Sequence, residues 1–301
     1  MNKVSRYVNK TAKEDVYNWF QAARHRGLQA NVDPVELAWL LKTCAGVDSL
    51  TLRLLRAGES GEMRLHCSLE ALDQIWTARL ETRQPIQYLA GTVQWRGLDL
   101  AVGPGVLIPR PETELLVDLA LAALEQHPEL ATRPWADIGT GSGAIALGLA
   151  QARPELRLWA VDCSDEVLAI ARRNVEALGL GSQVTLVEGR WLQPLPPQPL
   201  GGLLSNPPYI PHQTVTELEP EVRLHEPWLA LDGGDDGLDA YRVLIPAAAE
   251  QLISGGFWAV EHMAGQGAAI ADLLRKDGHW AAIANHADYA GLDRFVSAYR
   301  L

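Results

Sequence analysis

Apolar side chains recur every three or four residues in the first part of the chain, the spacing that places them on one face of a helix. The pattern runs through residues 11–80, and Pro34 stands where the first turn of a helix accepts a proline. We therefore predict a small all-helical domain over residues 1–84. Its clearest helical face consists of Val35, Leu37, Leu40 and Leu41.

The pattern changes at Pro85, where short apolar pieces replace the longer helical ones. We expect extended segments at residues 87–93 and 98–102, because glycines interrupt the chain around both pieces. Two short extended segments separated by a glycine turn are typical of a β-hairpin. The sequence thus predicts a hairpin linker over residues 85–110 and a domain boundary near residue 85.

Short apolar runs alternate with amphipathic segments from Pro111 to the end of the chain. The first of these segments is a predicted helix whose opening turn holds Pro111, Glu112 and Glu114, residues suited to the positive end of a helix. Strands that alternate with helices form a mostly parallel sheet with helices on both faces. The fold class predicted for residues 111–301 is therefore α/β, with a mostly parallel, doubly wound sheet.

The last two apolar runs depart from this alternation, since only a loop separates them. They predict an antiparallel hairpin that closes one side of the sheet. The strands expected in this domain are 135–138, 156–161, 184–187, 200–205, 257–261, 280–285 and 294–299. The helices expected between most of them are 144–152, 165–178, 238–253 and 266–277.

Composition and charge narrow the class of protein. With 48% hydrophobic and 21% charged residues among 301, the chain has an ordinary globular composition, which excludes disordered and fibrous classes. The formal net charge is -11, and it is uneven, since residues 1–90 carry +2 and residues 91–301 carry -13. An acidic surface repels phosphate backbones, so we expect no general nucleic-acid binding.

The sequence contains three cysteines, Cys44, Cys67 and Cys163. Their odd number and wide spacing provide neither a disulfide framework nor a zinc-binding motif, and they fit a reducing compartment. The first ten residues lack the apolar core of a signal peptide, and apolar runs such as 144–150 are far too short to cross a bilayer. We therefore predict a cytoplasmic protein without a membrane partner and without a metal site.

A glycine-rich turn follows the predicted strand 135–138 and leads into a helix. Three glycines at alternate positions let the backbone approach a ligand closely. Asp162 ends the next strand, where its carboxylate can accept both hydroxyls of a ribose. These features indicate a nucleoside-bearing cofactor, and a nicotinamide dinucleotide would satisfy them too. The turn consists of Asp137, Ile138, Gly139, Thr140, Gly141, Ser142 and Gly143.

A rigid turn, Asn206-Pro207-Pro208-Tyr209, follows the predicted strand 200–205. Asn206 and Pro207 each precede a proline, which holds both residues extended. The side-chain oxygen of Asn206 and the backbone carbonyl of Pro207 can then accept the two hydrogens of one planar N–H2 group, while Tyr209 offers a flat face for the rest of that group. This arrangement predicts a substrate with an amide or amino nitrogen.

Together, the glycine turn, Asp162 and the Asn-Pro-Pro-Tyr turn resemble class I methyltransferases that use S-adenosylmethionine and methylate planar nitrogens. Four further segments resemble the peptide chain release factor glutamine methyltransferase family, and the likeness covers essentially the whole chain. The segment Leu-Ile-Pro-Arg-Pro-Glu-Thr-Glu, residues 107–114, separates this family from other enzymes with an Asn-Pro-Pro-Tyr turn. The other three segments are Gln84-Pro-Ile-Gln-Tyr-Leu-Ala-Gly91, His225-Glu-Pro227 and Val260-Glu-His262.

The resemblance implies a Rossmann-like domain that transfers a methyl group from S-adenosylmethionine to the side-chain amide N5 of the Gln in the Gly-Gly-Gln loop of class 1 release factors. It implies that residues 139–143 pass beneath the methionine part of the cofactor, that Asp162 holds the ribose, and that Trp191 lies against the adenine. Residues 206–209 would hold the substrate amide, and Asn206 would also contact the cofactor. The product would be S-adenosylhomocysteine, and the helical domain would recognise the release factor.

Several positions have a second interpretation. Family members usually have an acidic residue before the aromatic, and Arg190 stands there instead, although an arginine cannot accept a hydrogen bond from the adenine amino group. Trp191 could alternatively belong to the core. Arg110 and Glu112 are candidates for shaping a glutamine pocket, but a capped helix start also explains Glu112. His262 is expected to pack rather than to catalyse.

Three other functions remain open from the sequence. A glutamine methyltransferase for a ribosomal protein would use the same turn with a different amino-terminal domain. A DNA adenine-N6 methyltransferase would need a basic groove and a target-recognition domain, which this acidic chain lacks. A noncatalytic nucleotide-binding module would leave the rigid acceptor pair at residues 206 and 207 without a purpose.

Overall fold

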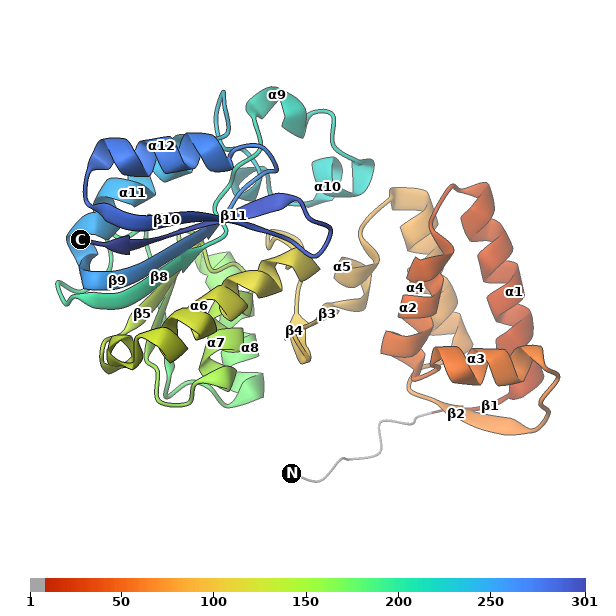
Figure 1. Ribbon diagram of the computed structural model, residues 1–301. Helices are drawn as coiled ribbons and strands as arrows, with labels where there is room; N and C mark the ends of the chain where they lie inside the picture. The colour runs from red at the N-terminus through yellow and green to blue at the C-terminus, as the bar shows by residue number, and fades with distance from the viewer. Residues whose placement is uncertain (1–8) are drawn as a thin grey trace. The chain divides into compact units, whose positions relative to one another are not determined.

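The computed structural model describes residues 9–301, and the chain divides into two compact units (Figure 1). The first unit ends at Gly91, and the second spans Thr92–Leu301. The predicted helical domain starts at residue 1, so its first eight residues lie outside the described range. Each unit has a hydrophobic cluster of its own, as expected for separately packed domains.

The first unit is mainly helical, as the spacing of its apolar residues predicts. Asp33, Asp48 and Ser68 start three of its helices, and each accepts a hydrogen bond from a backbone N–H of the first turn. Trp76 is fully buried and donates its indole N–H to the carbonyl of Ala23 (2.9 Å). The helices are α1 (Lys13–Gln29), α2 (Pro34–Leu40), α3 (Ser49–Arg56), α4 (Leu69–Thr82) and α5 (Ile86–Ala90), with a π-helical turn, η1, at Leu41–Ala45.

Two features of this unit differ from the prediction. The unit is not all helical, because β1 (Asn9–Ala12) and β2 (Glu62–Leu65) pair as a two-stranded antiparallel sheet. Residues 87–90 of the predicted extended segment 87–93 lie instead in α5, which begins after Pro85 and ends at Gly91 with a left-handed φ of 71°. β1 (Asn-Lys-Thr-Ala) and β2 (Glu-Met-Arg-Leu) lack the apolar runs that mark the other strands, and a helix of five residues is too short to show its periodicity.

The predicted hairpin is present, and it belongs to the second unit. It consists of β3 (Thr92–Trp95) and β4 (Leu98–Ala101), which pair antiparallel. Trp95 is buried and donates its indole N–H to the carbonyl of Arg110 (2.8 Å), which ties the hairpin to this unit. The stretch 85–110 is therefore divided between the two units.

A seven-stranded sheet forms the centre of the second unit. Its strands are β5 (Trp135–Ile138), β6 (Leu158–Asp162), β7 (Val184–Glu188), β8 (Leu200–Ser205), β9 (Leu252–Glu261), β10 (Trp280–Ala287) and β11 (Asp293–Arg300). The longer helices are α6 (Glu114–Gln126), α7 (Ala144–Ala152), α8 (Asp165–Leu178), α11 (Asp239–Gln251) and α12 (Gly267–Asp277). The shorter ones are α9 (His212–Val215), α10 (Pro220–His225) and the 3-10 turns η2 (Pro111–Thr113), η3 (Pro128–Thr132) and η4 (Trp228–Ala230).

The topology of this sheet is mostly parallel. The strand order is β10-β11-β9-β8-β5-β6-β7, in which the five strands from β9 to β7 are parallel, and β11 runs antiparallel to both β9 and β10. Figure 1 shows α6, α7 and α8 on one side of the sheet and α11 and α12 on the other. The α/β fold class and the terminal antiparallel hairpin are thus confirmed.

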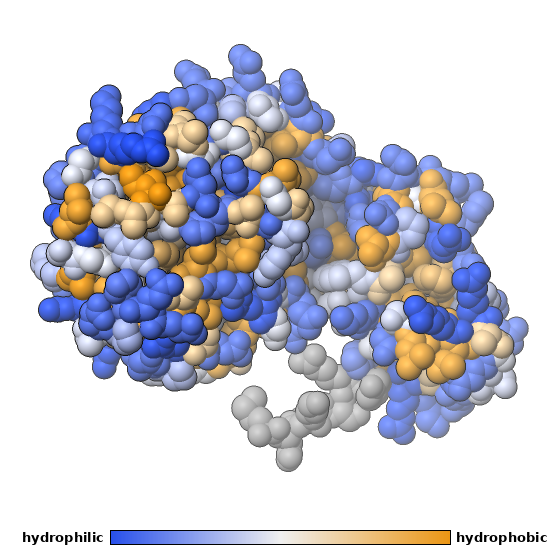
Figure 2. Space-filling view, viewed as in Figure 1, coloured by the Kyte–Doolittle hydropathy of each residue, from blue (hydrophilic) through white to orange (hydrophobic). Residues whose placement is uncertain are grey.

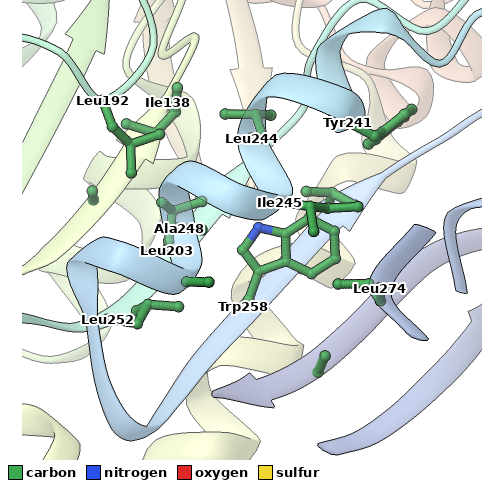
Figure 3. Packing of buried hydrophobic residues seen from close by; sticks show 14 of the residues in the cluster. Ile138, Leu192, Leu203, Tyr241, Leu244, Ile245, Ala248, Leu252, Trp258 and Leu274 are labelled. Carbon is green, nitrogen blue, oxygen red and sulfur yellow. The ribbon is translucent and has the colours of Figure 1, made fainter. Parts of the chain in front are cut away.

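The packing between the sheet and α11 explains why these segments are apolar. Leu203 of β8 and Trp258 of β9 are fully buried and pack in one cluster with Leu244 of α11 (Figure 3). Gly202 faces the opposite side of the sheet, where a glycine is required because a Cβ would lie 2.4 Å from the ring of Trp135. The close packing holds the strands in register and so determines where their carboxyl ends lie.

The surface of the described residues is mixed in polarity. Polar and charged side chains cover much of the visible face of each unit, with apolar side chains in separate patches between them (Figure 2). None of the described helices is both long and apolar enough to cross a bilayer. Within the same range, no group of three or more His, Cys, Asp or Glu side chains is arranged to hold a metal ion.

Candidate active site

Four neighbouring strands end at the same edge of the sheet. Ile138 pairs with both Val161 and Ser205, and Ser205 pairs with Val260. Since these strands are parallel, the residues at their carboxyl ends lie next to one another, where open α/β sheets bind ligands. These residues are the glycine turn after β5, Asp162 of β6, Asn206 after β8 and Glu261 of β9.

The glycine turn after β5 is open at Gly139 and Gly141, on the side where a side chain would lie. Gly139, Gly141 and Gly143 have φ values of 75°, 56° and 85°, which other residues adopt only with strain. A Cβ added at Gly139 would come no closer than 4.0 Å to its nearest neighbour, the backbone oxygen of Asn206, and one at Gly141 would be 4.0 Å from Val106. The turn therefore leaves room for a ligand against its backbone, beside the Asn-Pro-Pro-Tyr turn.

Asp137 fastens the turn to the helix that follows it. Its Oδ2 accepts hydrogen bonds from the hydroxyl of Thr140 (2.6 Å) and from the backbone N–H of Ala146 in the first turn of α7 (3.1 Å). Its Oδ1 is buried and has no hydrogen-bond partner among the described residues. Burial raises the pKa of this carboxyl to about 6, against the effect of the two hydrogen bonds. A second contact that holds the glycine turn comes from Asn174, whose side-chain Nδ2 donates to the carbonyl of Ser142 (2.8 Å).

We expect Asp137→Asn to change how the stability of the protein depends on pH. A carboxyl whose pKa is raised by folding contributes stability that is fully present below its unfolded value of 3.8 and is lost as the pH rises through about 6. The stability of the variant relative to the wild type should therefore increase between about pH 4 and pH 6.5, by on the order of 3 kcal/mol in total. Above about pH 6.5 this difference should stay constant. Denaturant unfolding of both proteins is the measurement, and a difference that does not vary with pH would contradict the raised pKa.

Asp162 is fixed by the backbone at both of its carboxylate oxygens. Oδ2 accepts the N–H of Gly141 (3.0 Å), and Oδ1 accepts that of Ser164 (3.2 Å). Burial raises the pKa of this carboxyl, and the hydrogen bonds oppose the rise. Each oxygen keeps a further lone pair, so the carboxylate can still accept two hydroxyl hydrogens.

The segment after β7 starts beside Asp162, because Gly189 donates its N–H to the backbone carbonyl of Asp162 (2.9 Å). Trp191 is half-buried, has a left-handed φ of 56°, and packs against the hydrophobic cluster of the second unit. Arg190 is exposed. A contact between the accessible part of Trp191 and an adenine stays a prediction, and so does the effect of Arg190 on it.

A cavity of about 160 Å³ lies beside Asn206. It is smaller than the roughly 300–1,000 Å³ of a pocket for a small-molecule ligand, so its size suits the side chain of a single residue. Arg110, Asn206 and Tyr209 are the polar members of its lining. The rest of the lining is aliphatic: Leu107, Ile210, Leu218, Val222, Ala230 and Leu231.

Arg110 lines this cavity and forms an ion pair with Glu226. Its Nη2 donates to Oε1 of the buried Glu226 (2.6 Å), and burial raises the pKa of Glu226 while Arg110 opposes the rise. Glu112 is half-buried and is not among the residues that line the cavity.

His262 is fully buried, with Nδ1 2.9 Å from the carbonyl oxygen of Met263, and burial lowers its pKa. This is the environment of a packing residue.

Three polar residues without a role assigned from the sequence hold the Asn-Pro-Pro-Tyr turn. Asn206 donates its Nδ2 hydrogen to the hydroxyl of Thr113 (3.3 Å), and Thr113 donates to Oε2 of Glu261 (2.6 Å). Tyr209 donates its hydroxyl to Oε1 of Glu261 (3.1 Å) and accepts a hydrogen bond at its carbonyl from Gln266 (2.9 Å). Thr113 and Glu261 stand in segments that carry the family resemblance, and Gln266 carries no such signal.

The chain matches known methyltransferases over most of its length. Residues 113–221 match the family model described as Methyltransferase small domain. A release factor glutamine methyltransferase of Gloeobacter violaceus is 45% identical over 281 residues, which cover 93% of this chain and 96% of that protein. The chain belongs to the release factor glutamine methyltransferase family. A second family member, from Synechocystis sp., is 43% identical over 296 residues, which cover 96% of this chain and 97% of that protein.

The similarity to the release factor glutamine methyltransferase family extends over the first unit as well. The matches to both relatives cover more than nine tenths of the chain, so they include the helical unit as well as the sheet. Among solved structures, the catalytic domain of hMettl16 aligns with a TM-score of 0.54 and 15% identity, covering 76% of this chain and 80% of that chain. At this identity the likeness concerns the fold alone.

Proposed function

We propose that this chain transfers a methyl group from S-adenosylmethionine to the side-chain amide N5 of the Gln in the Gly-Gly-Gln loop of class 1 peptide chain release factors. The observation that carries the proposal is the position of Asn206, which borders both the open glycine turn and the cavity of about 160 Å³. A cofactor at the turn and a side chain in the cavity would meet at this residue. The names of the family members, release factor glutamine methyltransferase, support the choice of glutamine.

The residues around the glycine turn fit S-adenosylmethionine. Gly139 and Gly141 leave the backbone accessible, and Asp162 has lone pairs for two ribose hydroxyls. The unpaired Oδ1 of Asp137 adds a second carboxylate, and two carboxylates favour a cation over a neutral ligand. When bound, the cofactor supplies an activated methyl group on a positively charged sulfur. Trp191 would contact the adenine through its accessible part.

The Asn-Pro-Pro-Tyr turn would activate the substrate by accepting its amide hydrogens. An amide nitrogen is a poor nucleophile, because its lone pair is delocalised into the carbonyl group. Asn206 Oδ1 and the carbonyl of Pro207 would take one N–H each, which concentrates electron density on the nitrogen and aims it. Tyr209 would lie against the flat amide, and Pro208 keeps the turn extended. Positioning and electrostatics carry the catalysis, and no strong general base is needed before attack.

The cavity would hold the glutamine side chain and exclude water. Its aliphatic walls suit the methylene groups of glutamine, while the ion pair of Arg110 with Glu226 gives one wall a fixed polar group. Arg110 keeps further N–H donors, because Glu226 accepts from Nη2. Glu112 lies outside the lining, and the proposal does not extend to it.

The rival substrates are a glutamine of a ribosomal protein and an adenine of DNA, because the same turn could hold either nitrogen. The charge of -13 over residues 91–301 opposes DNA. Parallel assays with labelled S-adenosylmethionine and release factor, ribosomes or DNA separate the three. We expect label in the release factor, and label in ribosomes or DNA without label in the factor would overturn the proposal. The proposal places the enzyme in the cytoplasm with this substrate.

Asp162→Ala should weaken the binding of S-adenosylmethionine. A carboxylate that accepts ribose hydroxyls forms charge-assisted hydrogen bonds, whose loss costs about 1.5 to 3 kcal/mol, a decrease in affinity of roughly 10- to 100-fold. Calorimetric titration with S-adenosylmethionine is the measurement. Asp165→Ala is the matched control, because Asp165 is an exposed residue in the first turn of α8. Equal affinities of the two variants for S-adenosylmethionine would contradict a cofactor contact and leave Asp162 with a structural role at the end of β6.

A further inference from the structure

A chain of hydrogen bonds leads from a buried carboxylate to the amide of Asn206. Glu261, 2% exposed, accepts the hydroxyl hydrogen of Thr113 at Oε2 (2.6 Å). Thr113, 3% exposed, accepts in turn from Nδ2 of Asn206 (3.3 Å). Oε1 of the same carboxylate accepts the hydroxyl of Tyr209 (3.1 Å). One carboxylate on β9 therefore holds both ends of the Asn-Pro-Pro-Tyr turn.

The direction of the hydrogen bonds from Asn206 to Thr113 to Glu261 determines which end of the Asn206 amide faces Thr113. A threonine hydroxyl has one hydrogen, and here that hydrogen is committed to Glu261. Only lone pairs of the hydroxyl are left toward Asn206, so the N–H2 end of the amide must point there. The carbonyl oxygen, Oδ1, then points the other way, and none of the described residues donates a hydrogen bond to it.

Both hydroxyl groups that contact the Glu261 carboxyl donate to it. Burial raises the pKa of Glu261, and the charge of Glu112 adds to the rise. The hydroxyls of Thr113 and Tyr209 and the charge of Arg294 oppose it. Burial and the charge of Glu261 raise the pKa of Tyr209 far above its usual value, so the phenol stays a donor. The direction of the hydrogen bonds is therefore consistent from Glu261 outward.

We propose that Thr113 and Glu261 are positioning residues that hold the Asn206 amide with Oδ1 toward the substrate nitrogen. The inference rests on the proposed function, in which Oδ1 accepts a hydrogen of the glutamine amide. The terminal torsion of an asparagine is broad and roughly two-fold, so the amide alone distinguishes poorly between its two orientations. In the reversed orientation, Nδ2 would meet the N–H2 of the substrate, donor against donor, and the reacting nitrogen would lose an acceptor.

The test compares two substitutions of Thr113 that differ by the hydroxyl. Thr113→Val keeps the volume and removes the hydroxyl, whereas Thr113→Ser keeps the hydroxyl. We expect Thr113→Val to lower kcat about tenfold, the effect of one orienting hydrogen bond, with KM for the release factor and the affinity for S-adenosylmethionine changed less than about twofold. Thr113→Ser should restore most of kcat. The same kcat in Thr113→Val and the wild type, or equal losses in the valine and serine variants, would overturn the inference.

Two further proteins keep the test decisive. Ser297→Ala removes a hydroxyl of similar burial on β11, 2.7 Å from Nε2 of His286, and should leave kcat unchanged. If the valine variant does not fold, Glu261→Met replaces it, because methionine has a similar length and removes both acceptor oxygens. Full kcat in Glu261→Met would also overturn the inference. A wild-type protein without activity on release factor would instead contradict the proposed function itself.

Discussion

Replacing Asn206 by alanine should nearly abolish methyl transfer while the protein still binds S-adenosylmethionine. The substitution removes the proposed acceptor, whose Nδ2 donates to Thr113, and leaves the backbone of the glycine turn in place. A preorganised hydrogen-bonding group of this kind contributes on the order of 100- to 1,000-fold to turnover. The loss should therefore appear in kcat, measured at saturating release factor, and not in the calorimetric affinity for the cofactor.

An exposed asparagine on another strand of the sheet provides a control for the loss of an asparagine side chain. Asn285 lies on β10, which β11 and β9 separate from β8. Asn285→Ala should leave kcat unchanged and change the free energy of unfolding by no more than about 0.5 kcal/mol, because Asn285 is exposed and lines neither the cavity nor the glycine turn. Near-normal kcat in Asn206→Ala would mean that the Asn-Pro-Pro-Tyr turn has a structural role only.

Removing the first unit should cost most of the activity on an intact release factor. The cut belongs between Gly91 and Thr92, where the two units meet in the sequence, six residues beyond the boundary expected near residue 85. The second unit contains the glycine turn, Asp162, Asn206 and the cavity, so it should still bind the cofactor. A tethered recognition domain raises the local concentration of the substrate loop, so we expect a loss of roughly 100-fold on the whole factor.

A short Gly-Gly-Gln peptide is the control substrate for this truncation. The peptide is too small to use a separate recognition domain, and its methylation should change far less than that of the factor. Binding of S-adenosylmethionine to the truncated protein shows that it is folded. An equal proportional loss on peptide and factor, in such a folded protein, would contradict the role of the first unit in recognition.

The periodic elements of the second unit were predictable because local signals mark their ends. The predicted helices at 144–152 and 165–178 agree with the observed α7 and α8, since Gly143 and Ser164 start them and Gly179 ends the second. The mostly parallel pairing of the strands followed from the alternation of strands and helices. The elements β1, β2 and α5 were missed, because β1 and β2 contain no apolar run and the five residues of α5 make less than two helical turns.

The support of the candidate site could not be predicted, because it depends on contacts between distant parts of the chain. Thr113 and Glu261 are separated by 148 residues, and Arg110 and Glu226 by 116. Each of these residues has an ordinary local explanation in its own segment, such as the start of a helix for Thr113. Only the folded chain shows that a carboxylate on β9 reaches the hydroxyl beside Asn206. The contact of Trp191 with the adenine and the part of Glu112 in a glutamine pocket stay predictions.

Mass spectrometry of the release factor after incubation with this protein and S-adenosylmethionine tests the account most directly. We expect the peptide that contains the Gly-Gly-Gln sequence to gain the mass of one methyl group, located by fragmentation on the glutamine side chain. The Asn206→Ala protein should leave the same peptide unmodified under the same conditions. A wild-type protein that binds the cofactor and leaves this glutamine unmethylated, or methylates another residue, would contradict the account.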